Sequence, residues 1–164
     1  MAADLLFLVI RLGEDRYAIE SSVVEEVVPL VRLKVLPGAP AGIAGVMNYR
    51  DDAIPIVDLN LLALGKATPA RLATRIVIVR WTPDALARES ELGRSCLLGL
   101  LVPAATGTLR VDPSTFVNPG VATDGAAYLG PVLTTPEGVV QRVDVSTLLS
   151  AEIRDALFRA GSAV

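Results

Sequence analysis

Short aliphatic runs separated by turn residues are the feature that most restricts the fold of this 164-residue chain. Residues 5–12 and 16–19 flank the polar turn Gly13-Glu14-Asp15, which is the pattern of a β-hairpin. Residues 74–81 include four consecutive β-branched residues, and such side chains favour the pleated surface of a strand. The chain is therefore expected to be mainly β.

Further strands follow from the same pattern. Residues 45–49 and 53–57 form a second candidate hairpin around Arg50-Asp51-Asp52. A third candidate hairpin joins residues 74–81 to 96–102 through a polar insertion over 82–95. Shorter strands are predicted at residues 109–111, 128–133 and 139–143. Prolines and glycines punctuate residues 29–42 and exclude a long helix from that segment.

Helical structure is expected at two places, and a third segment leaves the choice between a helical turn and a strand open. Asp58 is a suitable N-cap for a helical turn over residues 59–64, and residues 146–159 have apolar spacing close to that of one helix. Residues 22–24 fit either a short helical turn or a direct entry into the next strand, and periodicity does not decide between them.

A weak internal repeat links two distant segments. Val57-Asp58-Leu59 and Val143-Asp144-Val145 each end a strand run and begin a helical one, 86 residues apart. Two similar small β lobes would explain the repeat. Coincidence would explain it as well, because junctions of a strand, an aspartate and a helix are common.

Composition excludes several classes of function. The chain contains no histidine and only one cysteine, Cys96, so the usual zinc sites and nucleophile-base pairs are absent. A net charge of −3, 4% aromatic residues and no Lys/Arg cluster argue against nucleic-acid binding. No apolar run is long enough to span a membrane, and the N-terminal residues lack a signal-peptide pattern, so a cytoplasmic protein is expected.

The adjacent acids Glu25-Glu26 and Asp51-Asp52 are the only close carboxylate pairs to weigh as catalytic or metal sites. Neighbours on a strand point to opposite faces, so neither pair is expected to converge on one substrate. Neither a catalytic nor a metal or cofactor site is therefore predicted. Arg50, at a hairpin tip, could be a binding residue or an ordinary solvated arginine held by Asp51 or Asp52, and spacing alone favours the second.

A longer motif surrounds Arg50. Residues 36–50 read LPGAPAGIAGVMNYR and residues 54–59 read IPIVDL, a combination that resembles the signature of the CheW-like domain family. Tyr17-Ala18-Ile19, Leu98-Gly99-Leu100 and Val143-Asp144-Val145 follow the same plan along the rest of the chain. The resemblance covers nearly all of residues 1–164, which are expected to form a single domain.

The resemblance implies two five-stranded SH3-like β-barrel lobes packed side by side, with short helical turns and a C-terminal helix. It also implies a non-enzymatic adaptor without a cofactor, which couples chemoreceptor signalling tips to the regulatory domain of a CheA-type histidine kinase. Other CheW-like domains are further implied partners, and recruitment to membrane-associated receptor arrays is implied. A small-molecule-binding β-barrel is the alternative, but no set of convergent polar residues supports it.

By matching position, Val24, Glu26 and Arg50 fall where the family contacts receptors, with Asn48 shaping the Arg50 turn. Two departures from the family pattern stand out. Asp51 replaces the usual glycine after Arg50, and Asp51 and Asp52 are expected to compete for its charge. Pro103 stands where the family has aspartate, so its strand is expected to be bulged or at an edge. These departures suggest a divergent chemosensory system.

Overall fold

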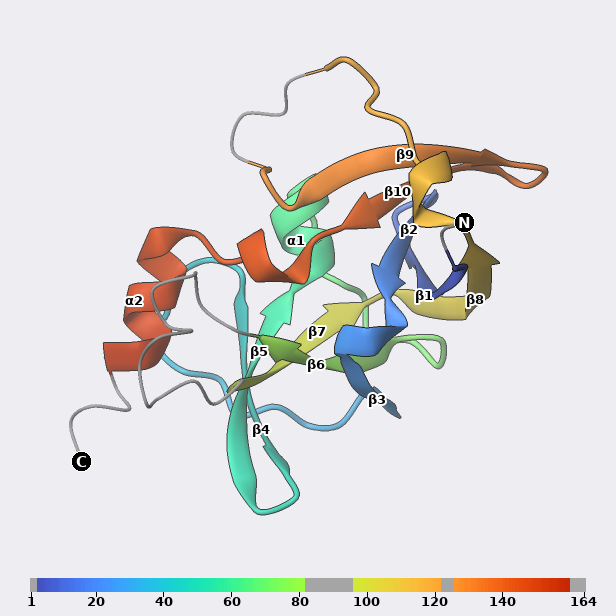
Figure 1. Cartoon of the computed structure of the whole chain (residues 1–164). Coiled ribbons are helices and arrows are strands. Elements are labelled where there is room, and N and C mark those ends of the chain that lie inside the picture. Colours follow the sequence, from blue (N-terminus) through green and yellow to red (C-terminus); the bar gives the residue numbers. More distant parts are fainter. Residues whose placement is uncertain (1–2, 82–95, 122–125, 160–164) are drawn as a thin grey trace.

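The computed structural model describes residues 3–81, 96–121 and 126–159, which form two five-stranded sheets (Figure 1). The strands of the first sheet are β1 (Leu5–Leu12), β2 (Asp15–Glu20), β8 (Ala104–Val111), β9 (Leu129–Thr135) and β10 (Gly138–Val143). The strands of the second are β3 (Val24–Pro29), β4 (Ile43–Tyr49), β5 (Asp52–Asp58), β6 (Arg75–Trp81) and β7 (Cys96–Val102). The helices are α1 (Leu59–Leu64) and α2 (Ala151–Arg159). The mainly β prediction is confirmed.

Each sheet is closed by one isolated bridge, so each lobe is a barrel. The second sheet has the order β3-β6-β7-β5-β4, and Lys34, beyond β3, pairs with Val46 of β4 through two hydrogen bonds of 2.9 Å. The first sheet has the order β8-β1-β2-β10-β9, and Val117, beyond β8, pairs in the same way with Val132 of β9. The expected pair of SH3-like lobes is present. We call them the first and the second barrel.

The two barrels repeat one strand order. The order β4-β5-β7-β6-β3 of the second barrel corresponds, strand by strand, to the order β9-β10-β2-β1-β8 of the first. Among the described strands only two pairs are parallel, β5 with β7 and β10 with β2. These two pairs occupy equivalent places in the two orders. The backbone N–H groups of Asp58 and Asp144 donate to the carbonyls of Gly42 and Tyr128, both at 2.7 Å. The repeat seen in the sequence is therefore structural.

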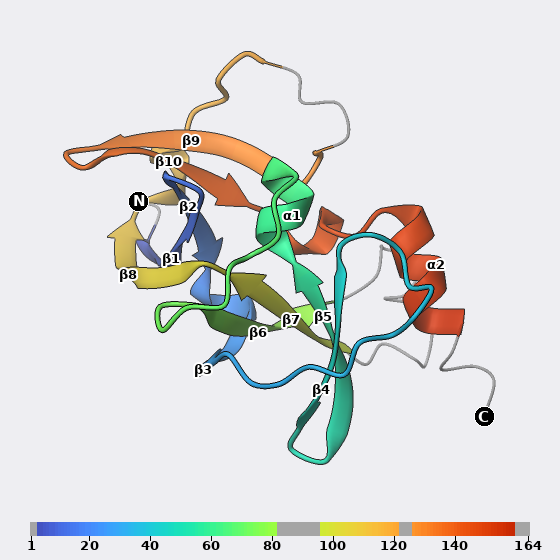
Figure 2. The ribbon, with the colours of Figure 1, turned by 180° about the vertical axis from the view of Figure 1, so that it is seen from behind.

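The barrels are not the two halves of the chain. The chain begins in the first barrel with β1 and β2, builds the whole second barrel from β3 to β7, and returns with β8 to β10 (Figures 1 and 2). The parallel contact of β10 with β2 brings Val143 beside Ile19. Parallel neighbours require a long connection, and here the inserted barrel provides it.

Three groups of buried side chains form the core. The largest belongs to both barrels and includes Ile10, Leu12 and Ile19 from the first, Val77, Trp81 and Leu100 from the second, and Leu148, Leu149 and Ile153 from the C-terminal segment. A second group fills the second barrel with Met47, Tyr49, Ile54, Ile56, Ile76, Ile78 and Leu101. A smaller group in the first barrel consists of Phe7, Ala18, Phe116 and Val140. The largest group of buried side chains is thus shared by the two barrels.

The predicted helical segments are corrected in one place. For residues 22–24 the short helical turn is the alternative observed, because a 3-10 turn over Ser21–Val23 ends where β3 begins. Residues 146–159 are not one helix. Asp144 caps a 3-10 turn over Val145–Thr147, Leu148 and Leu149 are then buried in the shared core, and α2 begins only at Ala151. Ser150 Oγ accepts from the N–H of Ile153 and starts this separate helix.

The strand expected to be bulged or at an edge does not contain Pro103, but β8, which begins directly after it, lies at an end of the first sheet and has a register shift on β1. Pro103 lies in no strand; it is the single residue between β7 and β8, where the chain crosses from the second barrel to the first. β7 ends at Val102, lies between β6 and β5, and keeps one register along β6. The proline therefore removes no ladder hydrogen bond. The predicted polar insertion over residues 82–95 lies outside the described residues. No helix among the described residues is long and apolar enough to cross a membrane.

Candidate protein-binding site at the β4–β5 hairpin

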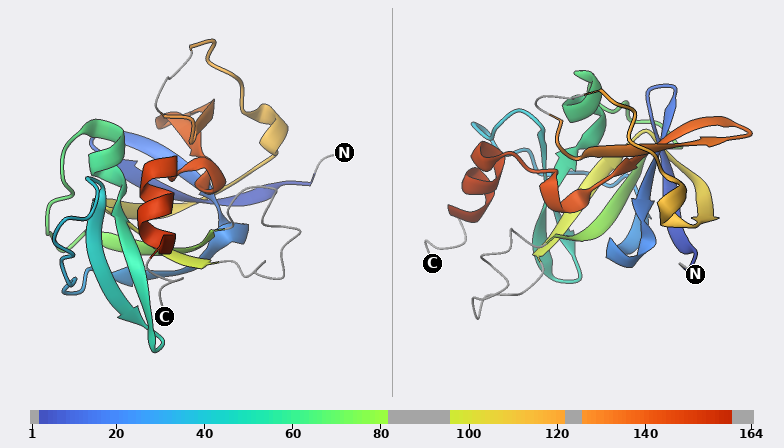
Figure 3. Two further views of the ribbon diagram at one scale, coloured as in Figure 1. Left: turned by 90° about the vertical axis from the view of Figure 1, so that its left-hand side faces the viewer. Right: turned by 45° about the horizontal axis from the view of Figure 1, so that its top comes forward.

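The β4–β5 hairpin projects from the second barrel (Figures 2 and 3). Arg50 follows the last residue of β4 and so lies at the tip of this hairpin. Tyr49 pairs with Asp52, so the turn has two residues, Arg50 and Asp51, and Asp52 already belongs to β5. Their φ angles are 49° and 69°. Two consecutive positive φ values are those of a type I′ turn, which matches the twist of a hairpin but is uncommon for arginine. Asp51 thus takes the conformation for which glycine is usual.

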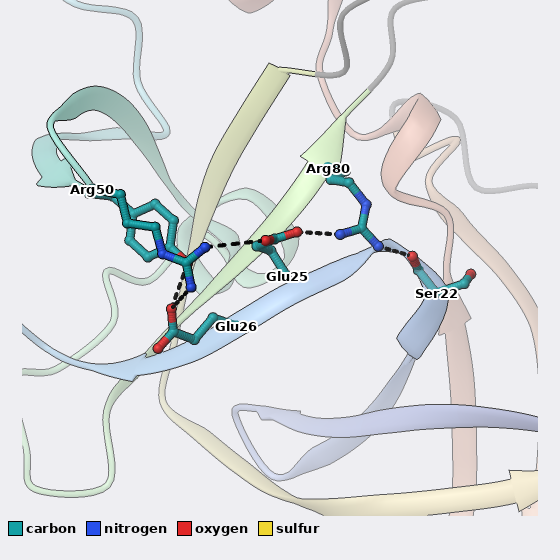
Figure 4. Close-up of polar contacts among 6 residues, drawn as sticks. Ser22, Glu25, Glu26, Arg50 and Arg80 are labelled. Carbon is teal, nitrogen blue, oxygen red and sulfur yellow. Dashed lines mark hydrogen bonds and ion pairs between the residues drawn. The ribbon is translucent and has the colours of Figure 1, made fainter.

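Two glutamates of β3 contact the Arg50 guanidinium (Figure 4). Arg50 Nη1 lies 3.6 Å from Glu25 Oε1, and Arg50 Nη2 lies 3.4 Å from Glu26 Oε2. The register of β3 on β6 shifts between Val24 and Glu26, so Glu25 is the extra residue of a β-bulge. The bulge brings both carboxylates to one guanidinium, and the prediction that adjacent acids diverge is wrong for this pair.

A second donor engages each of these carboxylates. Arg80 of β6 donates to Glu25 and to the Ser22 carbonyl (Figure 4). Tyr49 Oη donates to Glu26 Oε2 at 2.5 Å. The guanidinium carbon of Arg50 also lies 5.0 Å from the centre of the Tyr49 ring, within cation–π range. The hydrogen bond to Glu26, together with burial, raises the pKa of the Tyr49 hydroxyl above its usual value.

The residues expected to contact a receptor occupy one end of the second barrel. Glu26 and Arg50 touch each other, while Val24 is half-buried against the shared core. Asn48 is exposed on β4 opposite Ala53. Within the described residues its side chain makes no hydrogen bond to the Arg50 turn, so the expected shaping of that turn by Asn48 is not observed.

The expected competition from Asp51 and Asp52 is also not observed. Both are exposed, and the ion pairs among the described residues join Arg50 to Glu25 and Glu26 instead. The positive φ values of the turn and the cation–π contact place the guanidinium over Tyr49. Sequence reasoning missed Glu25, Tyr49 and Arg80 as members of the cluster. Alternation along β4 indicates a buried Tyr49, but no local pattern indicates the bulge at Glu25.

A pocket on the first barrel bears on the small-molecule alternative. One open pocket of about 350 Å³ lies on the first barrel, lined in part by Asn118, Leu129 and Gln141. Its glutamine donates to the Gly130 carbonyl, and the Asn118 side chain accepts from Gly120 N–H, so both polar side chains have partners within the chain. No group of three potential metal ligands occurs among the described residues. Burial raises the pKa of the Cys96 thiol.

Two barrels around a shared core, with an ion-paired arginine on an exposed hairpin, define a mainly β domain. The model of the CheW-like domain matches residues 6–152, well over half of the chain. The chain therefore belongs to the CheW-like domain family.

Individual relatives agree with this assignment. The chemotaxis protein CheW of Rhizobium meliloti (strain 1021) is 26% identical over 148 residues, which cover 89% of this chain and 88% of that protein. The chemotaxis protein CheW of Treponema pallidum (strain Nichols) is 38% identical over 50 residues, which are 30% of this chain and 29% of that protein.

A solved structure has the same fold. The crystal structure of the scaffolding protein TtCheW from Thermoanaerobacter tengcongensis aligns with a TM-score of 0.74 and 25% identity. The alignment covers 93% of this chain and 91% of that chain, so it includes both barrels.

Proposed function

We propose that this protein is a non-enzymatic, cytoplasmic chemosensory scaffold, which couples the signalling tips of chemoreceptors to the regulatory domain of a CheA-type histidine kinase. The observation that carries the proposal is the family match across both barrels. The names of the relatives, chemotaxis protein CheW and scaffolding protein CheW, support it. Recruitment to membrane-associated receptor arrays and contacts with other CheW-like domains belong to the same proposal.

The receptor-contact surface in this proposal consists of Val24, Glu26, Asn48 and Arg50. The Arg50 side chain is 66% exposed, and its planar guanidinium can pair with a receptor carboxylate through two parallel hydrogen bonds. Asn48 is exposed on the same hairpin and offers a donor and an acceptor. Val24 is half-buried, so it would contribute a small apolar contact at the base of this surface.

The two departures from the family pattern leave this surface intact. Asp51 keeps the hairpin turn, because aspartate tolerates positive φ better than most residues. Pro103 lies between strands and disturbs neither barrel. We propose that this coupling takes place in a divergent chemosensory system, which serves motility or another output.

A binding experiment tests the proposal. The purified full-length chain is titrated separately with the hairpin tip of a cognate chemoreceptor and with a CheA regulatory domain, and both affinities are measured by calorimetry. We expect dissociation constants of tens of micromolar or tighter, which is about −6 to −7 kcal/mol. If neither partner binds in that range, the coupling function is wrong.

A further inference from the structure

Both carboxylates that face Arg50 are held more closely by another donor than by Arg50 itself. Glu25 is bonded to Arg80, whose guanidinium is also anchored on the Ser22 carbonyl. Glu26 Oε2 accepts from Tyr49 Oη at 2.5 Å and lies 3.4 Å from Arg50 Nη2. The contacts of Arg50 with Glu25 and Glu26, at 3.6 and 3.4 Å, are longer than the ~2.7–2.9 Å of a strong charge-assisted hydrogen bond.

The charges of the cluster balance because Arg80 is present. Arg50 and Arg80 carry two positive charges, and Glu25 and Glu26 carry two negative ones. Without Arg80, Arg50 alone would face both acids, and the cluster would have a surplus negative charge. That surplus would draw the guanidinium inward and would repel an approaching carboxylate.

We propose that Arg80 and Tyr49 are positioning residues, which hold Glu25 and Glu26 in place so that Arg50 stays loosely paired and open to a carboxylate of the receptor. The inference rests on the proposed function for the identity of the partner. The effect of Arg80 and Tyr49 on the pairing of the Arg50 side chain needs no partner, so it can be measured on the free protein. The exposure of the side chains, 66% for Arg50 and 40% for Arg80, limits the effect to the range of a surface ion pair.

A rescue experiment tests the role of Arg80. Arg80→Gln keeps a polar side chain at this position but removes the charge that restrains Glu25. We expect receptor-tip affinity to fall by about two- to fivefold. Adding Glu25→Gln to this variant should return the affinity to the wild-type value or above it, because the freed acid is gone. If the double variant binds as weakly as Arg80→Gln alone, Arg80 is structural or contacts the receptor directly, and the proposal is wrong.

Arg75→Gln is the matched control for this series. Arg75 also lies on β6, and its guanidinium donates to the carbonyls of Leu72 and Thr74 rather than to the cluster. Its substitution should leave receptor affinity unchanged. An equal loss in this control would assign the effect of Arg80→Gln to the net charge of the protein, against the proposal.

A measurement on the free protein separates this proposal from the receptor function. Side-chain NMR of the full-length chain reports how fast the Arg50 guanidinium rotates and exchanges its protons. Arg80→Gln and Tyr49→Phe should each slow these processes by about two- to fivefold, because Glu25 or Glu26 then pairs with Arg50 more closely. Rates of guanidinium rotation and proton exchange at Arg50 that stay unchanged in both variants would overturn the inference. Failure of the wild-type chain to bind a receptor tip would overturn the proposed function alone.

Discussion

At the scale of single residues, Arg50 combines an exposed guanidinium with a positive φ of 49°, a backbone conformation that few arginines adopt. Such conformations persist where the surrounding structure enforces them, and they are frequent at functional sites. Here the β4–β5 pairing enforces the turn, while Tyr49 and the two glutamates orient the side chain. The residue is thus presented by a rigid element.

Reversing the charge of Arg50 should separate receptor binding from kinase binding. Arg50→Glu would place a third acid beside Glu25 and Glu26, so receptor affinity should fall by about tenfold or more. Kinase affinity and the melting temperature should stay nearly constant, because exposed ion pairs contribute only about 0.2–1 kcal/mol each. Calorimetry with both partners measures the effect, and Arg110→Glu on β8 is the control. Equal loss of both affinities would mean that Arg50 is structural.

The raised pKa values of the three tyrosines predict that the free energy of unfolding falls at alkaline pH. Burial raises the pKa values of Tyr17 and Tyr128, and the hydrogen bond to Glu26 raises that of Tyr49. The folded state therefore favours the neutral phenols more than the unfolded chain does. Their contribution is fully present below about pH 10 and is lost as pH rises through the raised pKa values. Urea unfolding should show lower stability at about pH 11 than at about pH 9. Tyr49→Phe should lose less over this interval, and an equal loss would contradict the assignment for Tyr49.

At the scale of elements, β7 shows how tightly the second barrel is packed. Gly99 is buried in this central strand, and a Cβ atom there would lie 2.3 Å from Ile56 Cδ1 and 3.0 Å from Ile76 Cγ2. Ile56 belongs to β5, the parallel neighbour of β7, so the missing side chain permits this close approach.

Gly99→Ala should therefore destabilise the protein by about 1–3 kcal/mol, as overpacking of a core does. Adding Ile56→Val removes the Cδ1 methyl group that the new Cβ atom of residue 99 would meet, and it should recover part of the lost stability. Gly130→Ala is the control, because its Cβ would meet nothing closer than 3.4 Å. Chemical denaturation measures all four proteins. A stability of Gly99→Ala equal to that of the wild type would contradict this packing.

At the scale of the whole molecule, the shared core links the two barrels into one body. Side chains of β1 and β2 pack with those of β6, β7 and the C-terminal segment, and Gly13 N–H donates to Asn60 Oδ1 across the barrels at 3.0 Å. The first barrel has only a small group of buried side chains of its own. Removing either barrel would expose side chains of the other barrel that belong to the shared core.

We therefore propose that the chain unfolds as a single cooperative unit. Trp81, the only tryptophan, lies in the shared core, so its fluorescence reports the contact between the barrels. The denaturation curves from Trp81 fluorescence and from far-ultraviolet circular dichroism should coincide. Two separated transitions would show that the barrels are independent domains.

Much of the fold could be predicted from local patterns. The strand runs, the Gly13 hairpin, the position of Arg50 in a turn and the Asp58 cap all depend on residues within a few positions of one another. The failures have a common origin in contacts between distant segments. Burial of Leu148 and Leu149 broke the predicted C-terminal helix, and the crossover between barrels gave Pro103 a place outside any strand.

The sequence by itself determined the mainly β architecture, because β-branched runs and turn residues act through local sterics and alternation. It also determined the hairpin that presents Arg50. Only the tertiary structure decided that β10 joins β2, that a bulge turns Glu25 toward Arg50, and that Arg80 holds Glu25. These features depend on burial and charge pairing between segments up to 124 residues apart, and no local pattern encodes such distances.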